Sequence, residues 1–288
     1  MSGQRPEHTG WFTDLDPDDL DGAATAITEG RSDQPRKWPE QAVQAGFATD
    51  EADYYDAVHE ATVHATREAV RAREASDDQQ LQHAIKAMDD CERTANELAE
   101  RAAEWAGSLF ADVDAGIEGA REVATREPET EAEGRAVSLA DRAVDLADEA
   151  AAIRGFIERT APSVAPNLAA MAGPVLATRL IALAGGLESL AKKPSGTVQV
   201  LGAEDALFAH LEGHAPSPKH GIIFTHEYVR ETRLEDRGSA ARAVAGKLTI
   251  AARIDHYSGD LREEVHEDLH DRIATIRARA DADEEDDR

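Results

Sequence analysis

The sequence predicts an all-α protein in which a long antiparallel coiled-coil hairpin is followed by a compact helical domain. A short N-terminal region, for which both all-α and α+β structure fit the sequence, precedes them. Residues 50–127 contain no proline and are rich in Ala, Glu, Arg and Leu, which favour long helices. Apolar residues recur at three- and four-residue spacings along two stretches, as in coiled coils. Between 161 and 256 the charge falls and glycines separate short helical stretches.

The N-terminal region, which we place at residues 1–76, predicts short elements and loops. Four prolines interrupt its first fifty residues, namely Pro6, Pro17, Pro35 and Pro39. Its apolar anchors are Trp11, Phe12, Trp38 and Phe47. They fit either a small core or a partner contact.

The hairpin is predicted at residues 77–160. Its first seam runs through Leu81, Ala84, Met88, Cys91, Ala95, Leu98, Ala102, Trp105 and Leu109. Its second seam, after a break at 127–134, runs through Ala136, Leu139, Ala143, Leu146, Ala150, Ile153 and Ile157. Asp77 and Asp78 precede the first seam, where acidic side chains can cap a helix. Because the seams are rich in alanine, we expect the two backbones to approach closely. By itself, this pattern predicts a solvated coiled coil that serves only as a spacer or as a dimerisation element.

The compact domain is predicted at 161–260, with Pro162 and Pro166 ending the hairpin. Helical stretches are expected at 174–184, 203–212 and 239–254, with a brief β-like run at 221–225. Residues 261–288 read as a charged helix that ends in the acidic tail DADEEDDR.

Charge and composition bound the class of protein. The 288 residues carry a net charge of −27. Residues 161–260 hold ten basic and ten acidic residues, so the rest of the chain holds 21 basic and 48 acidic residues. This composition is expected of a salt-rich cytosol, where charge serves solubility more than steering. No apolar run reaches the roughly 20 residues of a membrane span, no secretory signal is visible, and the one cysteine, Cys91, cannot form an internal disulfide. We therefore expect a cytoplasmic protein.

One enzyme motif occurs: His266 to His270 matches HExxH, whose histidines can bind zinc on one helix face. Its highly charged surroundings near the C-terminus, where we expect no ordered downstream region to supply a third ligand, argue against a zinc hydrolase. Phosphate-loop, nucleophile-elbow, dinucleotide and paired-cysteine motifs are absent from the sequence. We therefore expect no catalytic residue, no metal and no cofactor in this chain.

Basic residues in 185–253 stand at loop and helix-start positions, where backbone N–H groups can also face a phosphate. The candidates for RNA contact are Lys192, Lys193, His220, Arg237, Arg242 and Lys247. Ordinary surface charges, balanced by nearby carboxylates such as Glu204 and Asp205, would explain the same pattern.

Several spaced motifs in this region resemble the Nop domain of the archaeal scaffold protein of box C/D guide-RNA particles, a relative of the eukaryotic nucleolar Nop proteins. They are Ala165-Pro166-Asn167-Leu168, Ala184-Gly185-Gly186-Leu187, Thr197 to Glu204 (TVQVLGAE), Ala206-Leu207-Phe208, Pro218 to Ile223 (PKHGII), Ala245-Gly246-Lys247 and Ala251 to Asp255 (AARID). Residues 78–110 also resemble the family's first coiled-coil helix. The resemblance covers roughly 77–260, and the N-terminal region looks shortened relative to the family.

The resemblance implies a non-catalytic scaffold. Its Nop domain would bind a kink-turn RNA together with the ribosomal-type protein on that RNA, and its N-terminal region would hold fibrillarin. Fibrillarin, which binds S-adenosylmethionine, would carry the 2′-O-methylation of rRNA or tRNA. The partner-facing residues carried over by motif are Gln199, Gly202, Ala203, Glu204 and Phe208. The coiled coil would pair two copies, with seam candidates Leu81, Met88, Leu98, Trp105, Leu139, Leu146 and Ile153.

Two departures make the expected RNA face less positive than in the family. Asp205 stands where lysine is usual, and a basic residue that is common in the family near Ser239 is missing here. Recognition at high salt would then depend on shape, stacking and protein contact, and on a preformed RNA–protein pair. The alternative is a coiled-coil interaction scaffold that has lost RNA binding.

Overall fold

The computed structural model describes residues 10–31 and 36–286, and their contacts divide the chain between Ser76 and Asp77 into two units. Every regular element of the described residues is a helix, which confirms the predicted all-α class. No single helix among them is long and apolar enough to cross a membrane, although the bent pair of helices Pro166–Ala172 and Pro174–Ala184 passes that test jointly.

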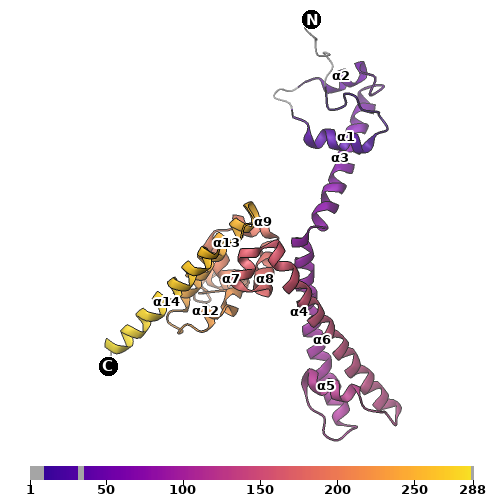
Figure 1. Ribbon diagram of the computed structural model, residues 1–288. Helices are drawn as coiled ribbons and strands as arrows, with labels where there is room; N and C mark the ends of the chain where they lie inside the picture. The colour runs from indigo at the N-terminus through magenta and orange to yellow at the C-terminus, as the bar shows by residue number, and fades with distance from the viewer. Residues whose placement is uncertain (1–9, 32–35, 287–288) are drawn as a thin grey trace. The chain divides into compact units, whose positions relative to one another are not determined.

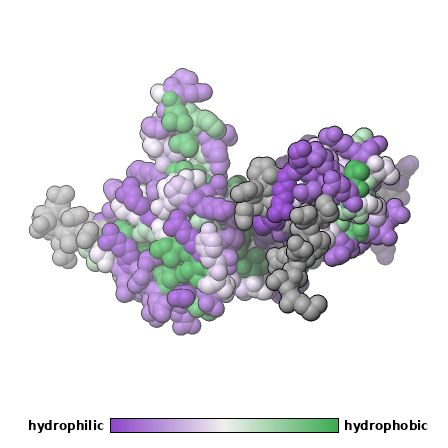
Figure 2. Space-filling view, turned by 90° about the horizontal axis from the view of Figure 1, so that it is seen from above, coloured by the Kyte–Doolittle hydropathy of each residue, from purple (hydrophilic) through white to green (hydrophobic). Residues whose placement is uncertain are grey.

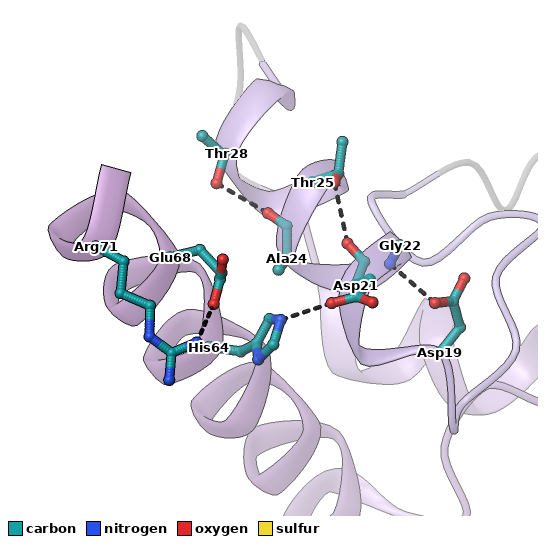
Figure 3. Close-up of polar contacts among 9 residues, drawn as sticks. All are labelled: Asp19, Asp21, Gly22, Ala24, Thr25, Thr28, His64, Glu68 and Arg71. Carbon is teal, nitrogen blue, oxygen red and sulfur yellow. Dashed lines mark hydrogen bonds and ion pairs between the residues drawn. The ribbon is translucent and has the colours of Figure 1, made fainter. Parts of the chain in front are cut away.

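The first unit contains α1 (Leu20–Glu29), α2 (Trp38–Gln44) and α3 (Glu51–Glu74). Asp19 and Asp50 cap α1 and α3 with their side chains. In Figure 3, His64 of α3 points toward Asp21 of α1, with 2.6 Å between Nε2 and Oδ1. The regular elements of this unit are all helices, so the α+β alternative for the N-terminal region is wrong for the described residues.

The aromatic anchors of the first unit form a small core. Phe12, Phe47 and Tyr54 are buried, and Trp11 and Trp38 pack against them. The indole nitrogen of Trp11 donates a hydrogen bond to the Tyr54 hydroxyl at 3.1 Å. These side chains thus give a short, proline-broken region its own apolar interior.

The second unit begins with the hairpin, formed by α4 (Asp77–Gly107) and α6 (Glu131–Val164), which run side by side in Figure 1. The hairpin is antiparallel: Leu81 near the start of α4 shares a core cluster with Ile157 near the end of α6. A short helix, α5 (Gly116–Ala124), packs against both helices at the far end of the hairpin and was not predicted. A Thr130–Glu133 capping box starts α6.

Two predictions about the hairpin were wrong in detail. Pro162 lies inside α6, and the helix ends only at Val164, because Ala165 precedes Pro166 and leaves the α-helical region. On α4 the buried face includes Ala99 and Ala106. Their predicted seam neighbours Leu98 and Trp105 lie at the edge of the interface, half-buried and exposed respectively.

The compact domain packs short helices around one long helix, α13 (Arg237–Tyr257). The elements before it are α7 (Pro166–Ala172), α8 (Pro174–Ala184), α9 (Leu187–Lys192), α10 (Ser195–Val200), α11 (Glu204–Leu211), the 3₁₀ helix η1 (Ile222–Thr225) and α12 (Glu227–Arg230). The three predicted helical stretches are confirmed as α8, α11 and α13. The β-like run at 221–225 is wrong, since the chain turns into η1 after two backbone hydrogen bonds with residues 199 and 201.

The last helix, α14 (Glu263–Asp286), packs against the compact core. Its Leu269, Ile273 and Ile276 are buried with the apolar residues of α7 to α13. The core therefore continues past residue 260, where we placed the end of the domain. Val265, Leu269, Ile273 and Ile276 recur at three- and four-residue spacings, so the sequence carried a signal for a buried face on this helix that the sequence analysis did not use.

One buried carboxylate joins three parts of this domain. Asp255 of α13 accepts hydrogen bonds from the backbone N–H groups of Asn167 and Leu168, both at 2.9 Å. It also accepts one from Asn167 Nδ2 at 2.6 Å. Asn167 then donates to the Asp260 carbonyl and accepts from the Arg262 N–H. The motif residues Asn167 and Asp255 thus hold the start of α7 to the connection between α13 and α14.

Candidate nucleic-acid interface

Two of the predicted RNA-contact residues meet around a phenylalanine that the sequence analysis did not name. The His220 ring stacks on Phe224, with 4.8 Å between centroids and 22° between planes. The Arg237 guanidinium lies over the same Phe224 ring, 5.3 Å from its centroid. We call His220, Phe224 and Arg237 the stacked cluster. The hydrophobic Phe224 within PKHGIIF was the available signal for it.

Arg237 is held in place by the chain. Its Nε donates to the Thr232 carbonyl at 3.0 Å, and its Nη2 donates to the Arg230 carbonyl at 3.2 Å. A guanidinium has five N–H donors, so this anchoring leaves donors for a phosphate or a base edge. The arrangement presents a planar, pre-positioned cation beside an aromatic stack.

His220 contributes stacking surface more than charge. Burial lowers its pKa below the usual histidine value, and the nearby positive charge of Arg237 lowers the pKa further. The ring is therefore predominantly neutral at neutral pH. A neutral imidazole on an aromatic ring suits contact with an unpaired base.

Hydrogen bonds with Gln199 hold the loop that carries His220. The Gln199 side chain donates to the Lys219 carbonyl at 2.7 Å, and the Gly221 N–H donates to the Gln199 carbonyl at 2.8 Å. A Cβ on Gly221 would lie 2.0 Å from the Leu201 carbonyl oxygen, so only glycine fits there. Gln199, predicted to face a partner, thus supports this loop.

The other predicted partner-facing residues lie on or before α11. Glu204 accepts a hydrogen bond from the Gly202 N–H at 2.9 Å and so orders the start of that helix. Ala203 is half-buried next to it. No residue of α11 is buried, and Phe208 is 63% exposed while Leu211 is 71% exposed. The exposed apolar face, including the unpredicted Leu211, is available to a partner.

The remaining RNA candidates do not join the stacked cluster. Lys192 pairs with Glu188 at 2.5 Å, and Lys247 pairs with Asp268 of α14 at 2.7 Å. The half-buried Lys193 follows the last residue of α9, and the Ala191 carbonyl of that helix accepts a hydrogen bond from Arg253 near the far end of α13. Arg242 is exposed one helical turn after Gly238, which lies beside the Lys219 side chain. Lys219 and Arg242 therefore extend the basic character near the start of α13.

The hairpin seam residues divide into two groups. Leu81 and Met88 are fully buried within the chain's own fold. Leu98, Leu139, Leu146 and Ile153 are half-buried, and Trp105 is 41% exposed. Only the second group offers surface to another molecule. Figure 2 shows that apolar patches are scattered over a mostly hydrophilic surface on the face it presents.

The HExxH histidines lie on α14, where they line a pocket of about 690 Å³. In the described part of the chain, no group of three or more His, Cys, Asp or Glu residues is arranged to hold a metal ion.

Comparison with known proteins places these features in a family context. A family model described as "Nop: snoRNA binding domain, fibrillarin" matches residues 47–275. A NOP5 family protein of Methanocaldococcus jannaschii is 44% identical over 141 residues, which are 49% of this chain and 34% of that protein. Nucleolar protein 58 of Schizosaccharomyces pombe is 35% identical over 148 residues, which are 51% of this chain and 29% of that protein. Human nucleolar protein 56 is 39% identical over 140 residues, which are 46% of this chain and 24% of that protein.

The match thus spans about a third or less of these relatives. A solved structure titled as a fibrillarin/Nop5p complex has a chain with the same fold, at a TM-score of 0.52 and 24% identity. The similarity covers 88% of this chain and 92% of that one.

Proposed function

Because this chain belongs to the Nop family, we propose that it is a non-catalytic scaffold of a box C/D guide-RNA particle. In this proposal the compact domain binds a kink-turn RNA with its ribosomal-type protein, and the N-terminal unit recruits fibrillarin. The methyl donor, S-adenosylmethionine, binds fibrillarin, and this chain carries no cofactor. We propose that the particle acts in the cytoplasm.

The observation that carries the proposal is the stacked cluster. Arg237 is anchored to backbone carbonyls over Phe224, and the neutral His220 ring stacks on that phenylalanine. Such an arrangement supports recognition by stacking and planar hydrogen bonding, which survive salt better than phosphate pairing does. The exposed apolar face of α11 supports a protein contact in the same domain.

Self-association through the hairpin is a second part of the proposal. Trp105 and the half-buried seam residues supply apolar surface for a second copy, while Leu81 and Met88 hold the hairpin together. A Trp105→Glu variant should therefore lower the molecular mass measured by light scattering without altering helix content. An unchanged mass would show that Trp105 does not lie in that interface.

The test is reconstitution in 1 M KCl or more with fibrillarin, the kink-turn-binding protein and a box C/D RNA. Co-migration and methyl transfer to a complementary target should both require this chain. Arg237→Glu and His220→Ala should weaken assembly by tenfold or more, since each removes part of the stacked cluster. Arg272→Glu, an equal charge reversal at an exposed position on α14, is the matched control.

The alternative is a coiled-coil interaction scaffold without RNA binding. Lys192 and Lys247 favour it, because both already pair with carboxylates of this chain. Assembly with fibrillarin that is indifferent to RNA, and to both cluster variants, would establish this alternative and overturn the proposal. Binding of naked kink-turn RNA as tight as that of the protein-loaded RNA would contradict the requirement for a preformed pair.

A further inference from the structure

A pocket of about 690 Å³ opens between α7, α12 and α14, in the same unit as the stacked cluster. Ala170, Met171 and Leu261 supply apolar lining, and Tyr228 supplies an aromatic ring. Leu261 is 56% exposed, so apolar surface reaches the mouth of the pocket. The space is large enough for one or two long side chains of another molecule.

One face of α14 forms the polar wall of this pocket. Its lining residues are Glu263, His266, Glu267, His270 and Asp271. Their positions follow the spacing i, i+3, i+4, i+7 and i+8, which places them on one side of a helix. Three of the five are carboxylates, against one lining arginine, the exposed Arg262. The sequence of α14 adds five further acidic residues between 281 and 286.

The pocket is built on fixed parts of the fold. The Asn167 side chain in its wall bonds to Asp255, Asp260 and Arg262. The Met171 carbonyl is 3.0 Å from Nε2 of the buried His226. The α7 wall is therefore held in place by hydrogen bonds within the fold, which reduces the ordering that binding has to impose on it.

We propose that this pocket binds an arginine or lysine side chain from a basic segment of a partner protein. The aliphatic stem of such a side chain fits the lining of Met171 and Leu261, and its cation is attracted by Glu263 and Glu267 at the rim. The Tyr228 ring already has a cation partner within the chain, the Arg277 guanidinium 5.9 Å from its centroid, so the attraction for the ligand's cation comes from Glu263 and Glu267 and Tyr228 contributes apolar wall.

Other occupants fit the chemistry less well. Carboxylates at the rim repel the phosphates of a nucleic acid. The acidic end of this chain is repelled for the same reason. The pocket's histidines belong to no group of three potential metal ligands in the described residues. A basic peptide segment is the ligand that matches both the apolar floor and the acidic rim.

The experiment uses the full chain and a fluorescein-labelled peptide of alternating arginine and glycine, followed by fluorescence anisotropy in 0.15 M KCl. A peptide with citrulline in place of each arginine tests the need for charge at nearly constant shape. We expect the arginine peptide to bind at least tenfold more tightly than the citrulline peptide.

Two variants separate the pocket from the general negative charge of the chain. Glu263→Gln combined with Glu267→Gln should weaken binding about tenfold, because it removes the rim charges. Glu235→Gln combined with Glu264→Gln changes the net charge equally, at exposed positions outside the pocket, and should change binding less than twofold. Ala170→Phe fills the pocket from an exposed position on α7 and should abolish binding without changing any charge.

Equal weakening by the two charge variants, or unchanged binding by Ala170→Phe, would overturn the proposal in favour of diffuse attraction. Circular dichroism and thermal unfolding establish that each variant is folded. Arg237→Glu should leave peptide binding unchanged, and the Glu263 and Glu267 variant should still assemble with RNA. Failure here is therefore distinguishable from failure of the proposed scaffold function.

Discussion

At the scale of single residues, Asp255 is a side chain whose loss should strongly destabilise the compact domain. It is only 7% exposed and accepts three hydrogen bonds from residues 167 and 168. Removing it leaves buried donors without an acceptor, each at about 1–3 kcal/mol. We expect Asp255→Ala to lower the free energy of unfolding by about 3–5 kcal/mol in urea titrations.

Asp260→Ala is the matched control, because Asp260 is exposed and supplies its backbone carbonyl to Asn167. Its effect should stay within about 0.5 kcal/mol. Asp255→Asn should also destabilise, since its amide hydrogens would face donors. A loss below 1 kcal/mol for Asp255→Ala would contradict the structural role given to this carboxylate.

His226 should make stability depend on pH. Its Nδ1 accepts the Tyr228 N–H at 3.1 Å, and its Nε2 lies 3.0 Å from the Met171 carbonyl, so the ring is neutral in this arrangement. Burial lowers its pKa, against smaller raising effects from the Met171 carbonyl and Glu227, while His266 lowers it further. The unfolded chain then takes up the proton first as pH falls below about 6.5.

The contribution of His226 to stability is therefore complete above pH 6.5 and is lost progressively below that value. Thermal unfolding between pH 7.5 and 5 should show a fall in midpoint that is shallower for His226→Asn, which can still cap residue 228 but cannot titrate. Identical pH profiles for the two proteins would show that another group controls the fall.

At the scale of elements, α14 matters because a charged helix completes an apolar core. Leu269 is fully buried against α7 to α13. Leu269→Ala should lower the free energy of unfolding by about 3 kcal/mol, as large-to-small changes in cores do. Ala274→Gly, at an exposed position of the same helix, should cost about 1 kcal/mol through helix propensity alone. Equal losses for both would mean that α14 contributes helix but little packing.

The hairpin shows why seam patterns predict an element better than its exact face. The three- and four-residue spacing places two helices together correctly, yet an α-helix drifts about 20° per heptad against that repeat. Along α4 the buried face accordingly takes in Ala99 and Ala106, leaving Trp105 exposed. The alanines allow close approach, and Arg154–Glu92 and Arg121–Asp148 pairs link α6 to its two neighbours.

At the scale of the whole molecule, a net charge of −27 predicts that stability rises with salt. Repulsion among carboxylates opposes the compact state, and the Debye length falls from about 10 Å at 0.1 M to about 3 Å at 1 M. The midpoint of thermal unfolding should rise by about 5 °C or more between 0.1 and 1 M KCl and then level off.

Sucrose is the control, since it favours burial without screening charge. A rise that continues without levelling above 1 M KCl, as in sucrose, would point to strengthened apolar burial. A midpoint independent of KCl would contradict the role given to the net charge.

The sequence by itself determined the helical class, the hairpin and the family, because these depend on local propensity, seam spacing and short motifs. It also offered His220 and Arg237 as candidates for RNA contact, a prediction that remains to be tested. Their joint position around Phe224 depends on a loop anchored by Gln199, a contact across 20 residues that no local pattern encodes.

Only the tertiary structure decided which motif residues support the fold and which reach solvent. Asn167 and Asp255 are separated by 88 residues, and their bond became visible only once α7 lay against α13. The same packing buried Leu269 of a charged helix and opened the pocket beside Tyr228. Spacing along one helix can indicate which face is buried, but the distant segments that cover that face and supply its side-chain partners are set only by the tertiary structure.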